Sequence, residues 1–128
     1  MNIKQFVVIG ASVLTSLLCG RALAADTQGL YVRIAELEVD PVQLESFKAA
    51  TKELGETSVR VEPGTLVLYA VSEKENPGSV RVFEIYRDVD AYKEHTQTPH
   101  FKKFRATTDN MVKSRKLIDM VPISLAAK

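Results

Sequence analysis

The sequence predicts an α+β fold of the ferredoxin-like, split βαβ type, with an antiparallel sheet and its helices on one face. Four stretches rich in β-branched and apolar residues predict strands. Segments with helical spacing of apolar residues separate the first stretch from the second, and the third from the fourth. Turn residues alone join the second and third stretches, as in a hairpin. Both crossovers then place their helices on a common side of the sheet.

Residues 1–24 have the features of a secretory signal peptide that is cleaved after Ala24. Lys4 precedes an apolar run that is shorter than the roughly 20 residues of a membrane-spanning helix. Ala22 and Ala24 form the small-residue pattern of a cleavage position. The remaining chain, residues 25–128, has an ordinary size for one domain, and we expect it in the periplasm or outside the cell.

Charge and cysteine content exclude several classes of partner. The whole chain has a formal net charge of +1, and removal of the leader, with Lys4 and Arg21, leaves acids and bases almost balanced. We therefore expect no nucleic acid partner, and no membrane contact after cleavage. Cys19, the only cysteine, lies in the leader, so the mature domain has no disulfide and no cysteine metal ligand.

The first strand is predicted at Leu30–Val39, where β-branched and apolar residues dominate. Asp40 and Pro41 then fit the N-cap and the first position of a helix, and Gln43 stands at the third position of a capping box. Helical spacing of apolar residues extends this helix toward Val59. The residues that define the spacing are Leu44, Phe47, Thr51 and Leu54.

A hairpin is predicted after this helix. Glu62–Gly64 turns the chain into a second strand at Thr65–Val71. Asn76–Gly78 supplies turn residues and leads into a third strand at Val80–Tyr86. These two strands should therefore pair antiparallel.

Two short helices and a last strand complete the predicted fold. Asp88 should cap a helix that runs to about His95, and Thr98–Pro99 should cap a second helix. The last strand is expected at Lys116–Leu125, where Pro122 indicates an edge position or a bulge. The residues that fall on one side of the second helix are Phe101, Phe104, Thr108 and Met111.

The two hairpin strands also predict a homodimer. Thr65–Val71 is apolar on both faces, and Val80–Tyr86 nearly is, whereas a sheet with one wet face should alternate. A single layer of helices covers only one face, so a second subunit is expected on the other, sheet against sheet about a two-fold axis. The alternative is a monomer with valine and leucine on its surface.

Several short motifs of the chain point to one protein family. The first strand contains I-A-E-L-E-V, and E-P-G follows the first helix. Phe83–Glu84 is followed two residues later by an aromatic residue, Tyr86. The most specific motif is H-x-x-T-P-H-F at His95–Phe101, because it joins a helix end, a cap and a new helix at fixed spacing. By these motifs the chain resembles the antibiotic biosynthesis monooxygenase family over residues 31–122.

This resemblance implies a dimeric α+β barrel with a substrate cavity between the sheet and the helices of each subunit. Members of the family include cofactor-independent quinol and anthrone-type monooxygenases, haem-degrading enzymes and an isomerase of a phosphorylated signalling sugar. The haem-degrading branch uses a tryptophan and a later histidine, whose positions correspond to His95 and Arg105 here. The chain has no tryptophan, so haem cleavage is not expected, and we expect no cofactor.

The expected catalytic group is His95, because a cofactor-free oxygenase needs a base of near-neutral pKa to ionise a phenol or quinol. Glu84 is expected to orient it, since a charge in the middle of an apolar strand needs a partner. Glu36 should approach Glu84 across neighbouring strands on the same face. Each residue also has a purely structural interpretation. His95 would then only bond to a backbone carbonyl at a helix end, and Glu84 would form an ion pair with Arg81 or Arg33.

Further residues are expected at the site. His100 is assigned either a direct catalytic role or a capping role at its helix start. The polar-tipped side chains expected to line the cavity with Glu36 are Arg33, Tyr69 and Tyr86. No metal site is predicted, because His95 and His100 lack a spacing typical of metal ligands.

Three functions remain open at this point. The first is oxidation of a small aromatic quinol or phenol by molecular oxygen. The second is an isomerase or tautomerase that moves a proton next to a carbonyl of a small or sugar-derived substrate. The third is binding of a small ligand without catalysis, which the export signal favours.

Overall fold

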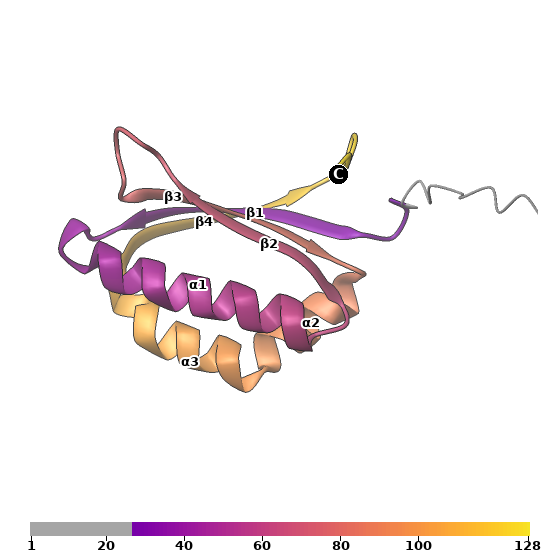
Figure 1. Cartoon of the computed structure of the whole chain (residues 1–128), viewed down its shortest axis with the longest axis horizontal. Coiled ribbons are helices and arrows are strands. Elements are labelled where there is room, and N and C mark those ends of the chain that lie inside the picture. Colours follow the sequence, from indigo (N-terminus) through magenta and orange to yellow (C-terminus); the bar gives the residue numbers. More distant parts are fainter. Residues whose placement is uncertain (1–26) are drawn as a thin grey trace, which may run out of the picture.

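The computed structural model describes residues 27–128, which form a four-stranded antiparallel sheet with three α-helices against one face (Figure 1). This arrangement confirms the predicted α+β, ferredoxin-like fold. The predicted signal peptide at residues 1–24, with Cys19, lies outside the described residues. Within 27–128, none of the helices is both long enough and apolar enough to cross a membrane.

Strands and helices follow one another in the predicted order, with two short 3₁₀ helices added beside α1 and β4. The elements are β1 (Tyr31–Val39), η1 (Pro41–Gln43), α1 (Leu44–Val61), β2 (Thr65–Ser72), β3 (Ser79–Tyr86), α2 (Val89–Gln97), α3 (Pro99–Thr108), η2 (Asp109–Met111) and β4 (Val112–Met120).

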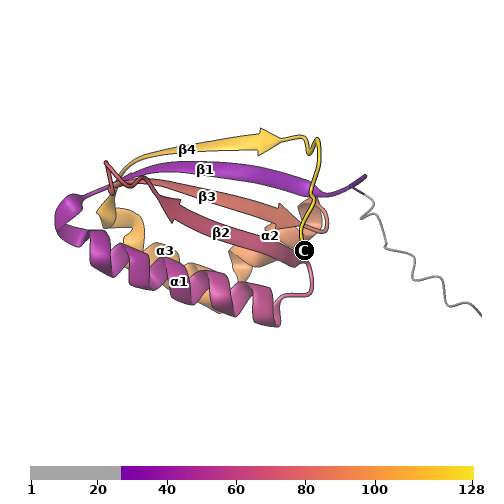
Figure 2. The same ribbon diagram turned by 45° about the horizontal axis from the view of Figure 1, so that its top comes forward.

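The strand order in the sheet is β2-β3-β1-β4, which can be followed in Figure 2. β3 pairs antiparallel with both β2 and β1, so it separates the two parallel strands of the first βαβ unit. The hairpin predicted for β2 and β3 is therefore confirmed.

The register of β1 and β3 decides which side chains share a face. Arg33 lies opposite Glu84, and Glu36 lies opposite Arg81. Successive side chains of a strand point to opposite faces, so the first pair and the second pair lie on different sides of the sheet. Arg33 and Glu84 face the helices, whereas Glu36 and Arg81 lie on the face that no helix covers, which we call the open face.

The hydrophobic core fills the layer between the sheet and the helices. Burial of these apolar side chains supplies most of the driving force for folding, because the described residues contain no cysteine that could add a disulfide. The buried cluster consists of Ala35, Leu37, Val39, Leu44, Phe47, Val80 and Val82.

The predicted helix caps are confirmed, except for the capping box. Oδ1 of Asp88 accepts the amide of Ala91 at 2.7 Å, and Oγ1 of Thr98 accepts the amide of Phe101 at 3.2 Å. Gln43 was expected to bond back to the amide of Asp40, and this was wrong.

The backbone amide of Asp40 donates instead to the carbonyl of Met111 at 2.8 Å, and the Gln43 side chain reaches the carbonyl of Asn110. A distant chain segment thus supplies the acceptor that the local pattern assigned to Gln43.

The last strand lies closer to the N-terminus than predicted, at Val112–Met120 rather than Lys116–Leu125. Its position at the sheet edge is as predicted, but Pro122 lies beyond its end. After Val112 the strand continues with four exposed polar residues, Lys113–Lys116, so no apolar pattern marked its first half. Pairing with β1 from Val39 onward fixes the true start.

Glycine is required in the turn between α1 and β2. A Cβ built on Gly64 would lie 2.4 Å from the Cβ of Ala91, which is closer than two carbon atoms can approach. The carbonyl of Gly64 also accepts the amide of Arg87 at 2.8 Å, so the turn cannot easily move away. Glycine is therefore required here, because the turn lies in close contact with the start of α2.

We expect Gly64→Ala to lower the free energy of unfolding by about 1 to 3 kcal/mol, because the added methyl group overpacks a backbone contact. Urea denaturation of the variant and the wild type measures this. Gly55→Ala is the matched control, since its Cβ would meet only the flexible Leu68 side chain at 3.3 Å. Equal stability of the two variants would contradict the requirement at Gly64.

Candidate functional site

One polar cluster joins the end of α1 to the junction of α2 and α3. Glu62 follows the last residue of α1, His95 lies in the last turn of α2, and His100 is the second residue of α3. Nδ1 of His95 lies 2.9 Å from Oε2 of Glu62, and Nε2 of His100 bonds to Oε1 of the same carboxylate. The motif at His95–Phe101 thus converges on an acid that the E-P-G turn presents.

Hydrogen bonds keep Glu62 ionised. Burial would raise the pKa of its carboxyl, but bonds from Thr65 and His100 and the nearby His95 hold that pKa below its usual value. An ionised carboxylate only accepts hydrogen bonds, so the ring nitrogens that face it each carry a proton.

The ring of His95 is sealed inside the protein, with a relative exposure of 1%. Burial lowers the pKa of His95, although Glu62 opposes this effect, so the neutral form is favoured. Because Nδ1 donates to Glu62, Nε2 carries the lone pair, and it has no hydrogen-bond partner among residues 27–128. The ring packs between Tyr86 and Phe101, at centroid distances of 5.4 and 4.8 Å.

A second polar group lies on the helix-covered face of the sheet. Nε of Arg33 is 3.0 Å from Oε2 of Glu84, and both side chains are almost fully buried. The guanidinium also lies over the ring of Tyr92, 4.4 Å from its centroid, as in a cation–π contact. The β1–β3 register sets this pair, and α2 supplies the aromatic cover.

The Arg33–Glu84 pair leaves hydrogen-bonding capacity unused. Nε of Arg33 and Oε2 of Glu84 are close but not aligned, so neither atom has a hydrogen-bond partner within the described residues. The hydroxyl oxygen of Tyr86 is likewise buried without a partner. Buried polar atoms are rarely left unpaired, so such a group points to a ligand that would satisfy them.

Burial raises the pKa of Glu84 to about 7, and the positive charge of Arg33 opposes the rise only in part. Burial also raises the pKa of the Tyr86 hydroxyl, and the charge of Glu84 adds to this effect. A carboxyl that titrates near neutrality can accept a proton at physiological pH, which an ordinary glutamate does poorly.

Arg33 and Glu84 border a cavity of about 80 Å³ between the sheet and the helices. Tyr92 and Phe101 close it from the side of the helices. An apolar cavity that holds benzene measures about 150 Å³. An aromatic ligand therefore needs the cavity to widen.

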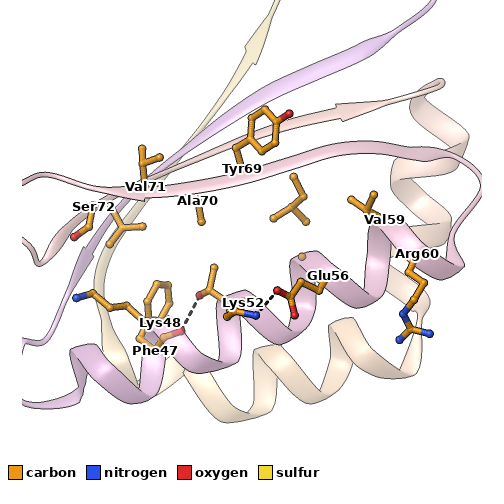
Figure 3. A pocket seen from close by; sticks show the side chains of 14 residues that line it. Phe47, Lys48, Lys52, Glu56, Val59, Arg60, Tyr69, Ala70, Val71 and Ser72 are labelled. Atoms are coloured by element: carbon orange, nitrogen blue, oxygen red, sulfur yellow. Dashed lines mark hydrogen bonds and ion pairs between the residues drawn. The ribbon is translucent and has the colours of Figure 1, made fainter. Parts of the chain in front are cut away.

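A larger groove of about 810 Å³ runs between α1 and β2 (Figure 3). It shares the side chains of Phe47, Thr51 and Leu68 with the inner cavity, so these three form the wall between the two spaces. Ala70 points from β2 toward α1, whereas Tyr69 points away from the helix (Figure 3). The groove therefore adjoins the inner cavity, and the partly buried Leu68 lines both.

The structure brings some of the residues predicted for the site together and separates others. Arg33, Glu84 and Tyr86 share the helix-covered face. Arg33 and Glu84 border the cavity, whereas Tyr86, which was also expected there, is not among its lining residues. The expectation that Glu36 approaches Glu84 was wrong, because the strand register puts them on opposite faces.

Two further expectations about geometry were also wrong. Tyr69 was expected to line the cavity, but it lies on the open face with 65% exposure. Glu84 was expected to hold His95, but the ring of His95 bonds to Glu62. The long side chain of Glu62 reaches the histidines from the end of α1, which strand register alone could not reveal.

Glu62 and Tyr92 were not predicted to belong to the site. Glu62 carried a usable signal, because an acid at the C-terminal end of a helix is unfavourable there unless cations or donors compensate it. Tyr92 had no such signal, since its place over Arg33 depends on how α2 packs on the sheet.

Comparisons with known proteins agree with this fold. The family model described as antibiotic biosynthesis monooxygenase matches residues 30–107. A protein of Bacteroides thetaiotaomicron with the same family name is 47% identical, with a TM-score of 0.76, and the match covers 80% of this chain and 97% of that one. No curated protein matches the sequence.

Two further solved structures support the same relationship. A protein of Nitrosomonas europaea that also carries the family name is 26% identical, with a TM-score of 0.70, over 74% of this chain and 91% of its own. A protein of Lactobacillus acidophilus named as a monooxygenase is 34% identical, with a TM-score of 0.68, over 70% of this chain and 42% of its own.

The pKa of Glu84 is about 7 in the wild type, and we expect Arg33→Met to raise it further. The substitution removes the opposing positive charge and keeps the burial. Titration of the Glu84 carboxyl carbon by NMR measures this value.

Arg81→Met is the control, since Arg81 pairs with Glu36 on the open face at 3.7 Å and should leave Glu84 unchanged. An unchanged pKa of Glu84 in Arg33→Met would show that the ion pair does not tune the carboxyl.

Proposed function

The chain belongs to the antibiotic biosynthesis monooxygenase family, and we propose that it oxidises a small quinol or phenol with molecular oxygen. The family supports a monooxygenase-like role in general. The observation that carries the finer proposal is Glu84, a carboxyl of pKa about 7 that borders the inner cavity beside Arg33. The signal peptide predicted at residues 1–24 makes an exported protein part of this proposal.

The first step of the proposed reaction is ionisation of the substrate. A phenolic hydroxyl has a pKa near 10 in water, so it is mostly protonated at neutral pH. Glu84 takes this proton, because its pKa lies near the working pH. The guanidinium of Arg33 then stabilises the phenolate, since its Nε has no other hydrogen-bond partner in the described chain.

The second step transfers electrons from the substrate to oxygen. The quinol anion reacts with molecular oxygen to form a carbon–oxygen bond, which gives a hydroperoxide. Glu84 returns its proton to the peroxide oxygen. The hydrogen on the oxygenated ring carbon then leaves as a proton while the oxygen–oxygen bond breaks, and the hydroxide set free takes up that proton to form water. One quinol and one oxygen molecule thus yield a hydroxylated quinone and one water, and the substrate supplies all the electrons.

In this proposal His95 supports the site and is not the base. It is absent from the lining of the inner cavity, whereas Glu84 is part of it. The His95 ring packs against Tyr86, at a centroid distance of 5.4 Å, and Tyr86 lies near Glu84. In this proposal His95 positions the tyrosine by ring packing, His100 bonds to Glu62, and neither histidine touches the reacting atoms.

An isomerase is the second candidate, because the same two groups suit its chemistry. Glu84 could remove a proton next to a carbonyl, and Arg33 could stabilise the resulting enolate. This reaction needs no oxygen, so anaerobic turnover separates it from oxidation. A protein that only binds its ligand would be stabilised by it without any turnover.

A homodimer also belongs to the proposal. The open face carries apolar side chains from several strands, and Tyr69 and Val71 are 65% and 62% exposed. A second copy packed sheet against sheet would cover them. The other open-face apolar residues are Ile34, Phe83, Ile118 and Met120.

We expect Glu84→Gln to lower kcat for quinol oxidation by at least about 100-fold, because the amide cannot accept the proton. An oxygen electrode with a panel of quinols measures this rate. In the wild type, kcat/KM should rise as the pH passes through about 7, since only the ionised carboxylate is a base.

Glu36→Gln is the matched control, because Glu36 lies on the open face and should leave the rate unchanged. A Glu84→Gln variant with full activity, or a rate that falls with rising pH over this range, would rule out Glu84 as the base.

We expect Tyr69→Glu to convert a dimer into a monomer, because the charge would be buried in the contact between the two sheets. Analytical ultracentrifugation gives the mass directly. Val42→Glu introduces the same charge at a residue of 92% exposure in η1, so it should remain dimeric. A wild-type chain that sediments as a monomer would contradict the two-sheet arrangement.

A further inference from the structure

We propose that Glu62, His95 and His100 bind a divalent first-row transition-metal ion of the zinc type. The three side chains offer two imidazole nitrogens and one carboxylate, and these ligand atoms all lie within 4.8 Å of one another. The inference does not rest on the proposed oxidation, which uses Arg33 and Glu84 instead.

The spacing of the donor atoms fits a metal ion. Nδ1 of His95 lies 2.9 and 3.1 Å from the two oxygens of Glu62, and Nε2 of His100 bonds to Oε1 of the same group. Zinc–nitrogen and zinc–oxygen bonds of about 2.1 Å place tetrahedral ligands about 3.4 Å apart. Small shifts of three side chains therefore open the space for an ion.

The ligands are already aimed at a common point. Each histidine presents one nitrogen to the carboxylate of Glu62, so no side chain needs a new rotamer. The metal ion displaces the proton that each of these nitrogens shares with Glu62, and the nitrogen then offers its lone pair. The hydroxyl of Thr65 donates to Oε2 of Glu62 and holds the carboxylate in place. Such outer contacts orient the ligands of known metal sites. Thr65 has an exposure of only 3%, so the contact is built into the interior.

Solvent can reach the cluster from one side. The side chains of Glu62 and His100 are 12% and 19% exposed, whereas that of His95 is 1% exposed. An ion can therefore enter past His100. Three protein ligands leave a fourth tetrahedral position for water, as in zinc sites with an open position.

The donor set selects the class of metal. Two imidazoles and one carboxylate suit zinc and its neighbours in the first transition row. Magnesium and calcium prefer more oxygen ligands, so they should bind weakly here. A bound ion would tie the end of α1 to the α2–α3 junction, in addition to the hydrogen bonds from His95 and His100 to Glu62.

Titration calorimetry with zinc chloride tests this site on chain purified without a polyhistidine tag and treated with a chelator. We expect one zinc ion per chain, a higher Tm with zinc, and no comparable effect of magnesium. His100→Gln and Glu62→Gln should each weaken zinc binding at least about 100-fold, and Thr65→Val about 10-fold. Circular dichroism checks that each variant is folded.

Glu56→Gln is the matched control, because Glu56 is an exposed carboxylate of α1 that pairs with Lys52 and should keep full affinity. Absence of stoichiometric zinc binding by the wild type would overturn the proposal, as would His100→Gln with unchanged affinity. If Glu62→Gln does not fold, His100→Gln alone decides, because His100 is partly exposed at the start of a helix. Oxygen uptake is measured separately, so either proposal can fail alone.

Discussion

The ion pair of Arg33 and Glu84, enclosed between the sheet and the helices, is the constraint on which the account depends. Removal of two charges from water is costly, and their attraction compensates only when good hydrogen bonds complete the arrangement. Here Nε of Arg33 and Oε2 of Glu84 lie 3.0 Å apart but are not aligned for a hydrogen bond. Burial therefore outweighs the attraction of Arg33 and raises the pKa of the Glu84 carboxyl to about 7. The sheet register places the two residues opposite each other, the helices bury them, and the proposed chemistry uses both.

The two polar groups of the interior differ in how well they are satisfied. Glu62 receives bonds from Thr65, His95 and His100, so it stays ionised. Oε2 of Glu84 has no hydrogen-bond partner among residues 27–128 and keeps its capacity for a ligand. The side chains of Tyr86 and His95 lie between the two groups and connect them by ring packing. One group thus suits a structural role, and the other suits proton transfer.

Much of the fold followed from local features of the sequence. Most elements could be predicted from the turn residues, from the helix caps Asp88 and Thr98, and from the composition of the strands. Each of these signals depends only on residues that are close in the sequence. The site followed only in part. Glu84 was identified because a charge in an apolar strand needs a partner, and His95 because the expected chemistry needs a base of near-neutral pKa. Arg33 and Tyr86 were identified as polar-tipped side chains of the same sheet. Their actual partners depend on register and on the reach of long side chains, so Glu62 was missed and Glu36 was misplaced. The start of β4 was missed because an exposed edge strand lacks a hydrophobic pattern.

A crystal structure with a phenol that oxygen cannot oxidise shows whether Glu84 and Arg33 bind the substrate. We expect the aromatic ring to enter the widened cavity, with its hydroxyl within about 3 Å of both the carboxylate of Glu84 and the guanidinium of Arg33. A ring held only in the groove between α1 and β2, with the inner cavity closed and the ion pair untouched, would contradict it.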